Sequence, residues 1–154
     1  MFTTLLLDDE QGPQPLMERY LNSFSHCVTR TRSVLGALTW FDRARFDFLV
    51  IHLPHVGQII KALALCRVLR SDPKTAAIRI LLISDASGMQ DKAKTGGVDE
   101  LLTNPYTQED VRAAVERLSL HGKRLHPPFM LGMTVHQTME AHSRGLLGWL
   151  RGPA

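Results

Sequence analysis

The stretch Phe46-Asp-Phe-Leu-Val-Ile-His-Leu-Pro-His-Val-Gly57 decides how this chain folds. Its apolar run stops abruptly at His52, and Pro54 follows two residues later. A run of about six residues rich in β-branched and aromatic types, ended by turn-forming residues, predicts a strand buried on both faces. Because open α/β sheets bind ligands beyond the carboxyl ends of their strands, His52 stands where chemistry is expected.

Short apolar runs alternate with helical patterns over residues 1–120. Strands are expected at Phe2–Leu7, Cys27–Arg32, Phe46–His52, Ile78–Ile83 and Leu101–Thr103. Apolar residues at helical spacing predict helices over 16–24, 34–44 and 58–70, a short helix ending at Thr95, and a last helix opening at Thr107. This alternation predicts right-handed crossovers and a parallel α/β sheet that helices cover on both faces.

The net charge of +3 is concentrated at the C-terminal end. Residues 1–119 hold 14 basic and 14 acidic side chains, whereas residues 120–154 hold four basic side chains and one acidic side chain. Equal numbers of basic and acidic side chains over residues 1–119 argue against a broad nucleic-acid-binding face. We therefore do not expect nucleic acid as a partner of residues 1–120.

The two cysteines, Cys27 and Cys66, form neither a metal-ligand spacing nor a disulfide framework. Each lies inside an apolar run, so we expect two buried, reduced thiols, which fits the cytoplasm. The sequence shows no signal peptide at its beginning and no apolar run near the ~18 residues that a membrane span needs. We therefore expect a soluble cytoplasmic protein that makes no membrane contact through residues 1–120.

Residues 121–154 are expected to form a linker and a helical tail. The linker is Leu125-His-Pro-Pro-Phe129, and an apolar stripe follows at Val135, Met139, Leu146 and Leu150. Gly145 and Gly148 weaken this helix by about 1 kcal/mol each relative to alanine, so it needs a partner surface. Three partners are open: its own domain, a second copy in a homodimer, or a membrane or DNA surface.

Five fragments, in their order and spacing, resemble the receiver domain of bacterial response regulators over residues 2–120. They are Leu-Leu-Leu-Asp-Asp-Glu at 5–10, Phe-Asp-Phe-Leu-Val-Ile at 46–51, Arg-Ser-Asp-Pro-Lys-Thr-Ala-Ala-Ile at 70–78, Leu-Ile-Ser-Asp-Ala at 82–86 and Gly-Gly-Val-Asp-Glu-Leu-Leu-Thr-Asn-Pro-Tyr at 96–106. The resemblance implies a flavodoxin-like, doubly wound sheet of five strands in the order 2-1-3-4-5. It also implies a role in two-component signal transduction.

The resemblance assigns roles to several positions, and three of them depart from the family's pattern. Asp8 and Asp9 match the acidic pair that binds Mg²⁺, and Ser84 matches the hydroxyl residue that contacts the phosphoryl group. The departures are His52 at the phosphoacceptor aspartate, Asn104 at the phosphate-binding lysine and Leu101 at the aromatic switch. An imidazole forms no acyl phosphate, an uncharged amide supplies no cationic contact, and leucine has no polar tip to switch.

A different alignment does not restore a phosphoacceptor. No Asp or Glu occurs between Asp47 and Asp72. Asp47 starts its strand, about 16 Å from the carboxyl end, which is too far to share a site with Asp8 and Asp9.

The pocket itself has several open interpretations. Repulsion between Asp8 and Asp9 is relieved by a metal or by another cation. We expect a metal-free, hydrogen-bonded Asp–His pocket, with weak Mg²⁺ binding, a zinc-type Asp-Asp-His site and phosphorylation of His52 as alternatives. Tyr106 is expected to pack on the last helix and to belong to an interaction surface.

Taken together, the residues predict an atypical pseudo-receiver that acts through protein–protein contact without phosphorylation. No catalytic constellation occurs, so an enzyme is not expected. The expected partner is another regulator, a histidine kinase or a second copy. The contact surface is the fourth helix, fifth strand and fifth helix, extended by the tail. Two alternative functions are a decoy for a histidine kinase and a metal- or pH-responsive module that uses Asp8, Asp9 and His52.

Overall fold

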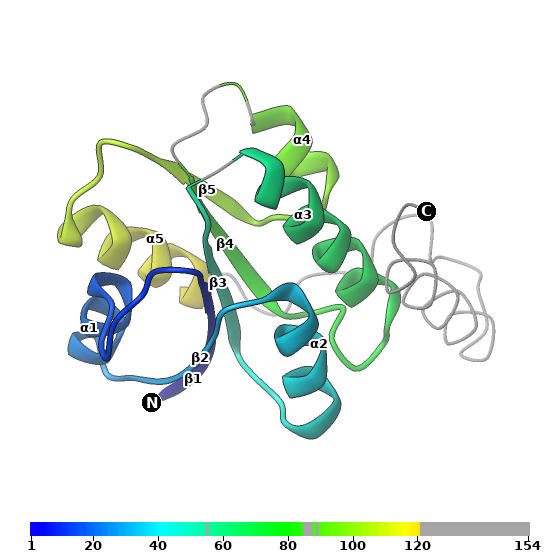
Figure 1. Ribbon diagram of the computed structural model, residues 1–154, viewed down its shortest axis with the longest axis horizontal. Helices are drawn as coiled ribbons and strands as arrows, with labels where there is room; N and C mark the ends of the chain where they lie inside the picture. Colours follow the sequence, from blue (N-terminus) through cyan, green and yellow to red (C-terminus); the bar gives the residue numbers. More distant parts are fainter. Residues whose placement is uncertain (55, 85–87, 89, 121–154) are drawn as a thin grey trace.

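A computed structural model describes residues 1–54, 56–84, 88 and 90–120 (Figure 1). The strands are β1 (Phe2–Asp8), β2 (His26–Thr31), β3 (Phe48–His52), β4 (Arg79–Ser84) and β5 (Glu100–Thr103). The helices are α1 (Leu16–Ser23), α2 (Val34–Arg43), α3 (Val56–Ser71), α4 (Gln90–Thr95) and α5 (Gln108–Leu120). The predicted tail stripe at Val135, Met139, Leu146 and Leu150 lies outside the described residues, so its partner stays a prediction.

All five strands are parallel and lie in the order β2-β1-β3-β4-β5, which confirms the predicted α/β fold class and strand order. In the β1–β3 ladder Asp8 is the direct partner of His52. In the β4–β5 ladder Ser84 is the partner of Thr103. The sheet therefore brings the ends of four strands to one edge.

Two hydrophobic layers cover the sheet, as expected for central strands with few polar residues. One layer packs α2, α3 and α4 on Leu5, Leu49, Ile51, Ile80 and Leu82. The other packs α1 and α5 on Leu6, Phe48, Val50, Leu81 and Ile83. Figure 1 shows α1 and α5 on one side of the strands and α2 and α3 on the other.

Polar side chains fix where two helices begin. The Ser33 hydroxyl caps α2 by accepting a hydrogen bond from the Gly36 N–H at 3.0 Å. At the start of α5, the Asp110 carboxylate accepts from the Thr107 N–H at 2.8 Å, and the Asp110 N–H donates to the Thr107 hydroxyl at 3.1 Å. This reciprocal pair is the capping box that the sequence predicts.

Most element boundaries differ from expectation by one or two residues, and one burial prediction differs as well. β3 begins at Phe48, although the Asp47 N–H still donates to the Thr3 carbonyl at 2.8 Å; the Asp47 carboxylate also accepts hydrogen bonds from the Thr3 N–H at 2.9 Å and from the Thr3 hydroxyl at 3.1 Å. α3 begins at Val56 rather than at residue 58, and β2 begins at His26. The prediction that both thiols are buried is wrong for Cys27. β2 is an edge strand, and Cys27 faces solvent, whereas Cys66 is buried.

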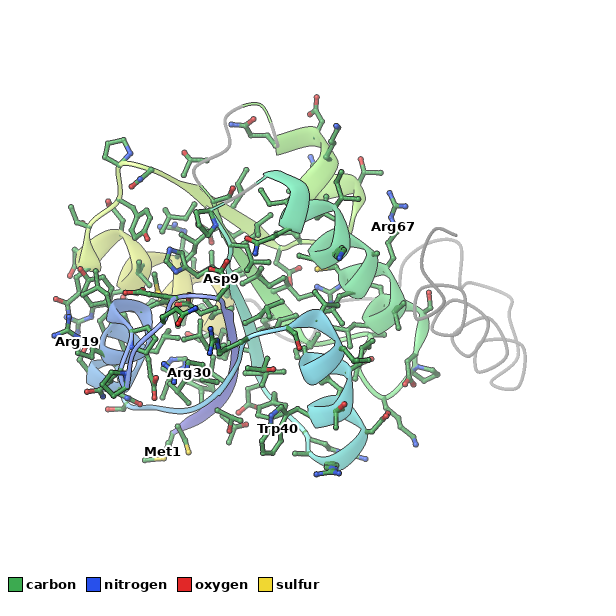
Figure 2. All side chains as sticks on the ribbon, in the orientation of Figure 1. Met1, Asp9, Arg19, Arg30, Trp40 and Arg67 are labelled. Atoms are coloured by element: carbon green, nitrogen blue, oxygen red, sulfur yellow. The ribbon has the colours of Figure 1, made fainter. Side chains whose placement is uncertain are left out.

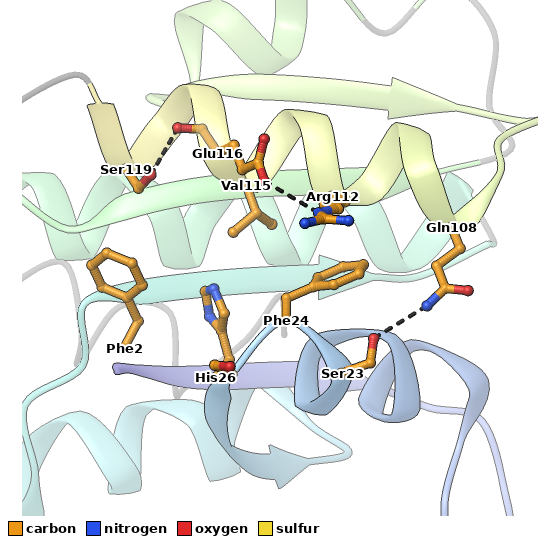
Figure 3. Close-up of a pocket in the computed structure, with 10 residues that line it drawn as sticks. Phe2, Ser23, Phe24, His26, Gln108, Arg112, Val115, Glu116 and Ser119 are labelled. Carbon is orange, nitrogen blue, oxygen red and sulfur yellow. Dashed lines mark hydrogen bonds and ion pairs between the residues drawn. The ribbon is translucent and has the colours of Figure 1, made fainter.

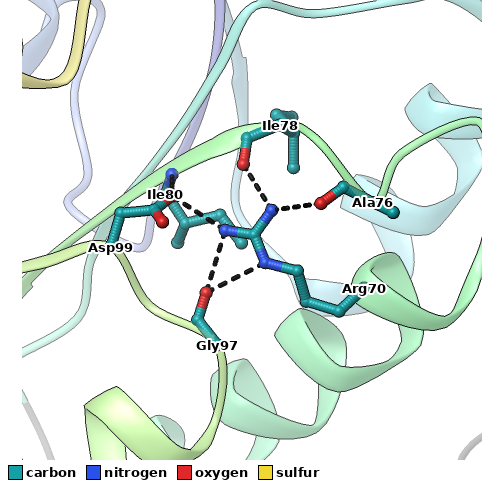
Figure 4. A network of polar contacts seen from close by, with 6 residues as sticks. All are labelled: Arg70, Ala76, Ile78, Ile80, Gly97 and Asp99. Carbon is teal, nitrogen blue, oxygen red and sulfur yellow. Dashed lines mark hydrogen bonds and ion pairs between the residues drawn. The ribbon is translucent and has the colours of Figure 1, made fainter. Parts of the chain in front are cut away.

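A buried arginine ties the C-terminal end of α3 to the segments before β4 and β5 (Figure 4). The guanidinium of Arg70, which is 2% exposed, donates to the carbonyls of Ala76, Ile78 and Gly97 at 2.5–3.0 Å. It also donates to the Asp99 carboxylate at 2.8 Å, and the same carboxylate oxygen accepts from the Ile80 N–H. A planar fork with five N–H donors suits this many acceptors, which lysine could not serve.

Candidate functional site

The carboxyl ends of β1 and β3 place a buried carboxylate beside an imidazole. Asp8 is fully buried, and its Oδ2 lies 3.1 Å from Nδ1 of His52. Its other oxygen, Oδ1, accepts a hydrogen bond from the Glu10 N–H at 2.9 Å. Since an ionised carboxylate only accepts, the ring nitrogen facing it carries the proton.

A tyrosine completes the chain of hydrogen bonds on the far side of the imidazole. The Tyr106 hydroxyl lies 3.0 Å from Nε2 of His52, and the two rings meet edge to face with 6.3 Å between their centroids. With the Nδ1–H directed at Asp8, the Tyr106 hydroxyl donates to Nε2. Carboxylate, imidazole and phenol thus form one continuous chain from three separate segments, with His52 only 20% exposed in the middle.

The second carboxylate of the predicted acidic pair has a different partner. The Gln58 side chain, near the start of α3, donates from Nε2 to the Asp9 carboxylate at 2.8 Å. The other atom of this amide, Oε1, is buried and makes no hydrogen bond among the described residues. Asp9, labelled in Figure 2, follows the end of β1 and is half-buried. The amide dipole therefore relieves part of its charge.

The remaining positions implied by the resemblance lie along or beyond the same edge. Ser84 ends β4 and is 1% exposed. Leu101 is half-buried and packs against the layer formed by α2, α3 and α4. Asn104 follows β5 and is exposed. Among the site positions, His52 contacts Asp8 and Tyr106 directly.

Glu10 follows the predicted acidic pair at the end of the first strand, but the sequence analysis assigned it no role in the site. One ligand atom from each of Asp8, Glu10 and His52 lies within 4.8 Å of the others, and Asp9 is not part of this group. A signal was present, because residues i and i+2 of an extended segment point the same way, so Asp8 and Glu10 were candidates to act together. The contact from Tyr106 had no such local signal, since 54 residues separate it from His52.

The solved structures that this chain is similar to include receiver domains and response regulators. The receiver domain of a sensor histidine kinase from Pseudomonas aeruginosa, solved with a magnesium ion in its active-site cleft, has a TM-score of 0.64 and 18% identity, covering 76% of this chain and 96% of that chain. The response regulator TrrA of Thermotoga maritima, solved with Mg²⁺ and BeF, has a TM-score of 0.65 and 18% identity, and the match covers 77% of this chain and 99% of that chain. The chemotaxis response regulator CheY4 of Vibrio cholerae has a TM-score of 0.66 and 19% identity, and the match covers 77% of this chain and 98% of that chain.

The fold is that of a receiver domain. No protein-family model matches the sequence, and a search of curated protein sequences finds no match. None of the helices among the described residues combines the length and the hydropathy that crossing a membrane requires.

The donor set at this edge fits Mg²⁺, the ion of two of these receiver structures, poorly. Mg²⁺ is held by oxygen ligands in near-octahedral geometry. Here one of the three grouped side chains is an imidazole, and the Asp9 carboxylate that the resemblance assigns to Mg²⁺ is bound by Gln58. This mixed set of oxygen and nitrogen donors therefore suits Mg²⁺ less well than oxygen ligands alone would.

A separate cavity opens at the amino ends of β1 and β2, away from the polar edge (Figure 3). Its volume is about 420 Å³, and Phe2, Phe24, His26 and Val115 are among its lining residues. His26 is 6% exposed, and Nδ1 of its imidazole lies 2.7 Å from the Thr4 hydroxyl oxygen. Burial lowers the pKa of His26 below 6.5, so this ring is neutral at physiological pH.

Proposed function

We propose that this chain is a cytoplasmic pseudo-receiver that signals through protein–protein contact and takes no phosphoryl group at the position of His52. One observation carries the proposal: an imidazole ends β3 where an acyl-phosphate acceptor needs a carboxylate. The sequence offers no Asp or Glu between Asp47 and Asp72, and Asp47 bonds Thr3 instead. The proposed role is regulatory rather than catalytic.

The hydrogen bonds of His52 also argue against a phosphohistidine. A ring nitrogen must present a lone pair to attack phosphorus. When the His52 ring carries one proton, Nδ1 donates it to the Asp8 carboxylate at 3.1 Å, and the lone pair of Nε2 accepts from the Tyr106 hydroxyl at 3.0 Å. The nearby carboxylates of Asp8 and Glu10 repel an incoming phosphate, and the exposed Asn104 brings no positive charge to offset that repulsion.

The proposal needs no cofactor and expects weak Mg²⁺ binding at most. Intact-mass spectrometry after incubation of the full chain with acetyl phosphate and Mg²⁺ tests it. We expect no phosphoryl adduct, while a conventional receiver domain treated alongside is modified. An adduct that maps to His52, and that disappears in His52→Gln, would contradict the proposal.

We further propose that α4, β5 and α5 form the contact surface, with the tail and Tyr106 at its edge. β5 is an edge strand of the sheet and lies between α4 and α5 in the chain, so no further strand covers its free edge. Exposed Lys92 and Lys94 on α4 and exposed Glu109 on α5 offer opposite charges that a two-fold axis could pair. The partner is a second copy, another regulator or a histidine kinase.

Light scattering on the full chain tests whether the partner is a second copy. A dimer is expected, and Lys92→Glu should weaken it, whereas Lys61→Glu on the exposed part of α3 should not. A monomer at all concentrations would remove the homodimer and leave the two heterologous partners. The proposed independence from phosphate would stand in either case.

A further inference from the structure

The group formed by Asp8, Glu10 and His52 carries an inference beyond the proposed function. We propose that these three side chains bind a divalent transition metal ion of the zinc class, in preference to Mg²⁺. Imidazole suits zinc, nickel, copper and iron, whereas Mg²⁺ takes oxygen ligands. The histidine that removes the phosphoacceptor thus changes which ion this edge prefers.

The spacing of the donor atoms suits a single ion. All three ligand atoms lie within 4.8 Å of one another, and Asp8 Oδ2 lies 3.1 Å from His52 Nδ1. Neighbouring ligand atoms around a tetrahedral ion with bonds of about 2.0–2.2 Å are separated by about 3.3–3.6 Å. Asp8 is buried, whereas Glu10 is exposed, so the ion has a path from solvent to the buried ligand.

The charges at this edge independently favour a cation. Three acidic side chains, Asp8, Asp9 and Glu10, are consecutive at the end of β1. Among the described residues no lysine or arginine forms an ion pair with any of them. Their hydrogen-bond partners are the Glu10 N–H, His52 and the Gln58 amide, which are all neutral when His52 carries one proton. A divalent ion would offset the uncompensated negative charge.

Tyr106 lets His52 bind an ion without leaving a ring nitrogen unsatisfied. Binding through Nδ1 requires the other neutral tautomer of the ring: the Nδ1 proton leaves to solvent and Nε2 takes up one proton from solvent, so the ring keeps a single proton. The Tyr106 hydroxyl, 3.0 Å from Nε2, both donates and accepts, so it changes from donor to acceptor. Metal-binding histidines regularly donate their other N–H to such an outer partner, and Tyr106 is therefore a positioning residue.

Competition between the full chain and a chromophoric chelator for Zn²⁺ alone tests the inference. We expect His52→Gln and Glu10→Gln to weaken Zn²⁺ binding, the former by at least about 100-fold, and Tyr106→Phe to weaken it about 10-fold. Tyr20→Phe is the matched control and should leave the affinity unchanged. Glu10 is exposed, so Glu10→Gln remains informative if His52→Gln does not fold.

Two further comparisons complete the experiment. His52→Asp should lose the preference for Zn²⁺ and gain affinity for Mg²⁺. A variant with His55, His121, His126, His136 and His142 all changed to glutamine should bind Zn²⁺ as the wild type does. The inference is overturned if the wild type does not bind Zn²⁺, if binding survives in both His52→Gln and Glu10→Gln, or if the five-histidine variant loses it. None of these results depends on whether the chain accepts phosphate.

Discussion

Replacing Arg70 by methionine should remove about 3 to 5 kcal/mol from the free energy of unfolding. Arg70 is 2% exposed, and its partner Asp99 is 15% exposed, so the change leaves a mostly buried carboxylate without its counter-ion. Breaking a buried ion pair on one side costs this amount, because the desolvated charge stays behind. Three backbone carbonyls also lose a donor, at about 1 kcal/mol or more each where water cannot replace it. Water entering beside Asp99 offsets part of that loss.

Urea unfolding followed by circular dichroism measures this effect. With a typical urea dependence, the midpoint should fall by about 2 M without a change in slope. Arg67→Met is the matched control, because Arg67 lies on the same helix and is exposed (Figure 2), and it should change stability by less than about 0.5 kcal/mol. Equal midpoints for the two variants would refute the reasoning that the network in Figure 4 joins α3 to β4 and β5.

Three other changes follow from single observations. In urea unfolding, Gly97→Ala should destabilise the fold by about 1 to 3 kcal/mol more than Gly12→Ala does. Both glycines have a positive φ, +92° at Gly97 and +120° at Gly12. Only at Gly97 does an added Cβ meet a neighbouring atom, Cγ of Arg70 at 2.9 Å. Equal losses would remove the steric argument. Burial lowers the pKa of His26 below its usual 6.5, so as the pH falls the imidazole is protonated in the unfolded chain before it is protonated in the folded chain. The contribution of His26 to stability is therefore complete above pH 6.5 and is lost as the pH falls below that value. The urea midpoint should therefore fall less steeply between about pH 7 and pH 5 in His26→Gln, and identical slopes would show that the ring does not titrate in this way. Burial raises the pKa of Cys66 to about 12, whereas Cys27 is exposed, so a thiol reagent should modify Cys27 alone in the native chain and both thiols after unfolding. Rapid native modification of Cys66 would contradict its burial.

The fold was predictable from the sequence because its signals are local. Continuous apolar runs such as Ile78–Ile83 mark strands buried on both faces, and the Thr107 to Asp110 capping box marks a helix start. Boundaries were less predictable where a side chain finds a distant partner. The carboxylate of Asp47 bonds Thr3, 44 residues away, and β3 begins only after it. The exposure of Cys27 depends on β2 being an edge strand, which its own apolar neighbours do not reveal.

The candidate site was predictable only as far as the strand ends. Asp8 and His52 each end an apolar run, so their meeting follows from the parallel sheet. The partner of Asp9 and the role of Tyr106 depend on how α3 and the segment after β5 fold back over the edge. Arg70 had no signal at all, because a basic residue near the C-terminal end of a helix is usually exposed. Contacts across 27 to 29 residues bury it instead.

The most direct test of the central claim is the amide NMR spectrum of the full chain with beryllofluoride and Mg²⁺. Beryllofluoride mimics a phosphoryl group on a carboxylate acceptor, and His52 offers none. We predict that the amide signals of Asp9 and Ser84, at the ends of β1 and β4, keep their positions when beryllofluoride is added to chain already holding Mg²⁺. Saturable shifts of both signals, absent with Mg²⁺ alone, would contradict the account.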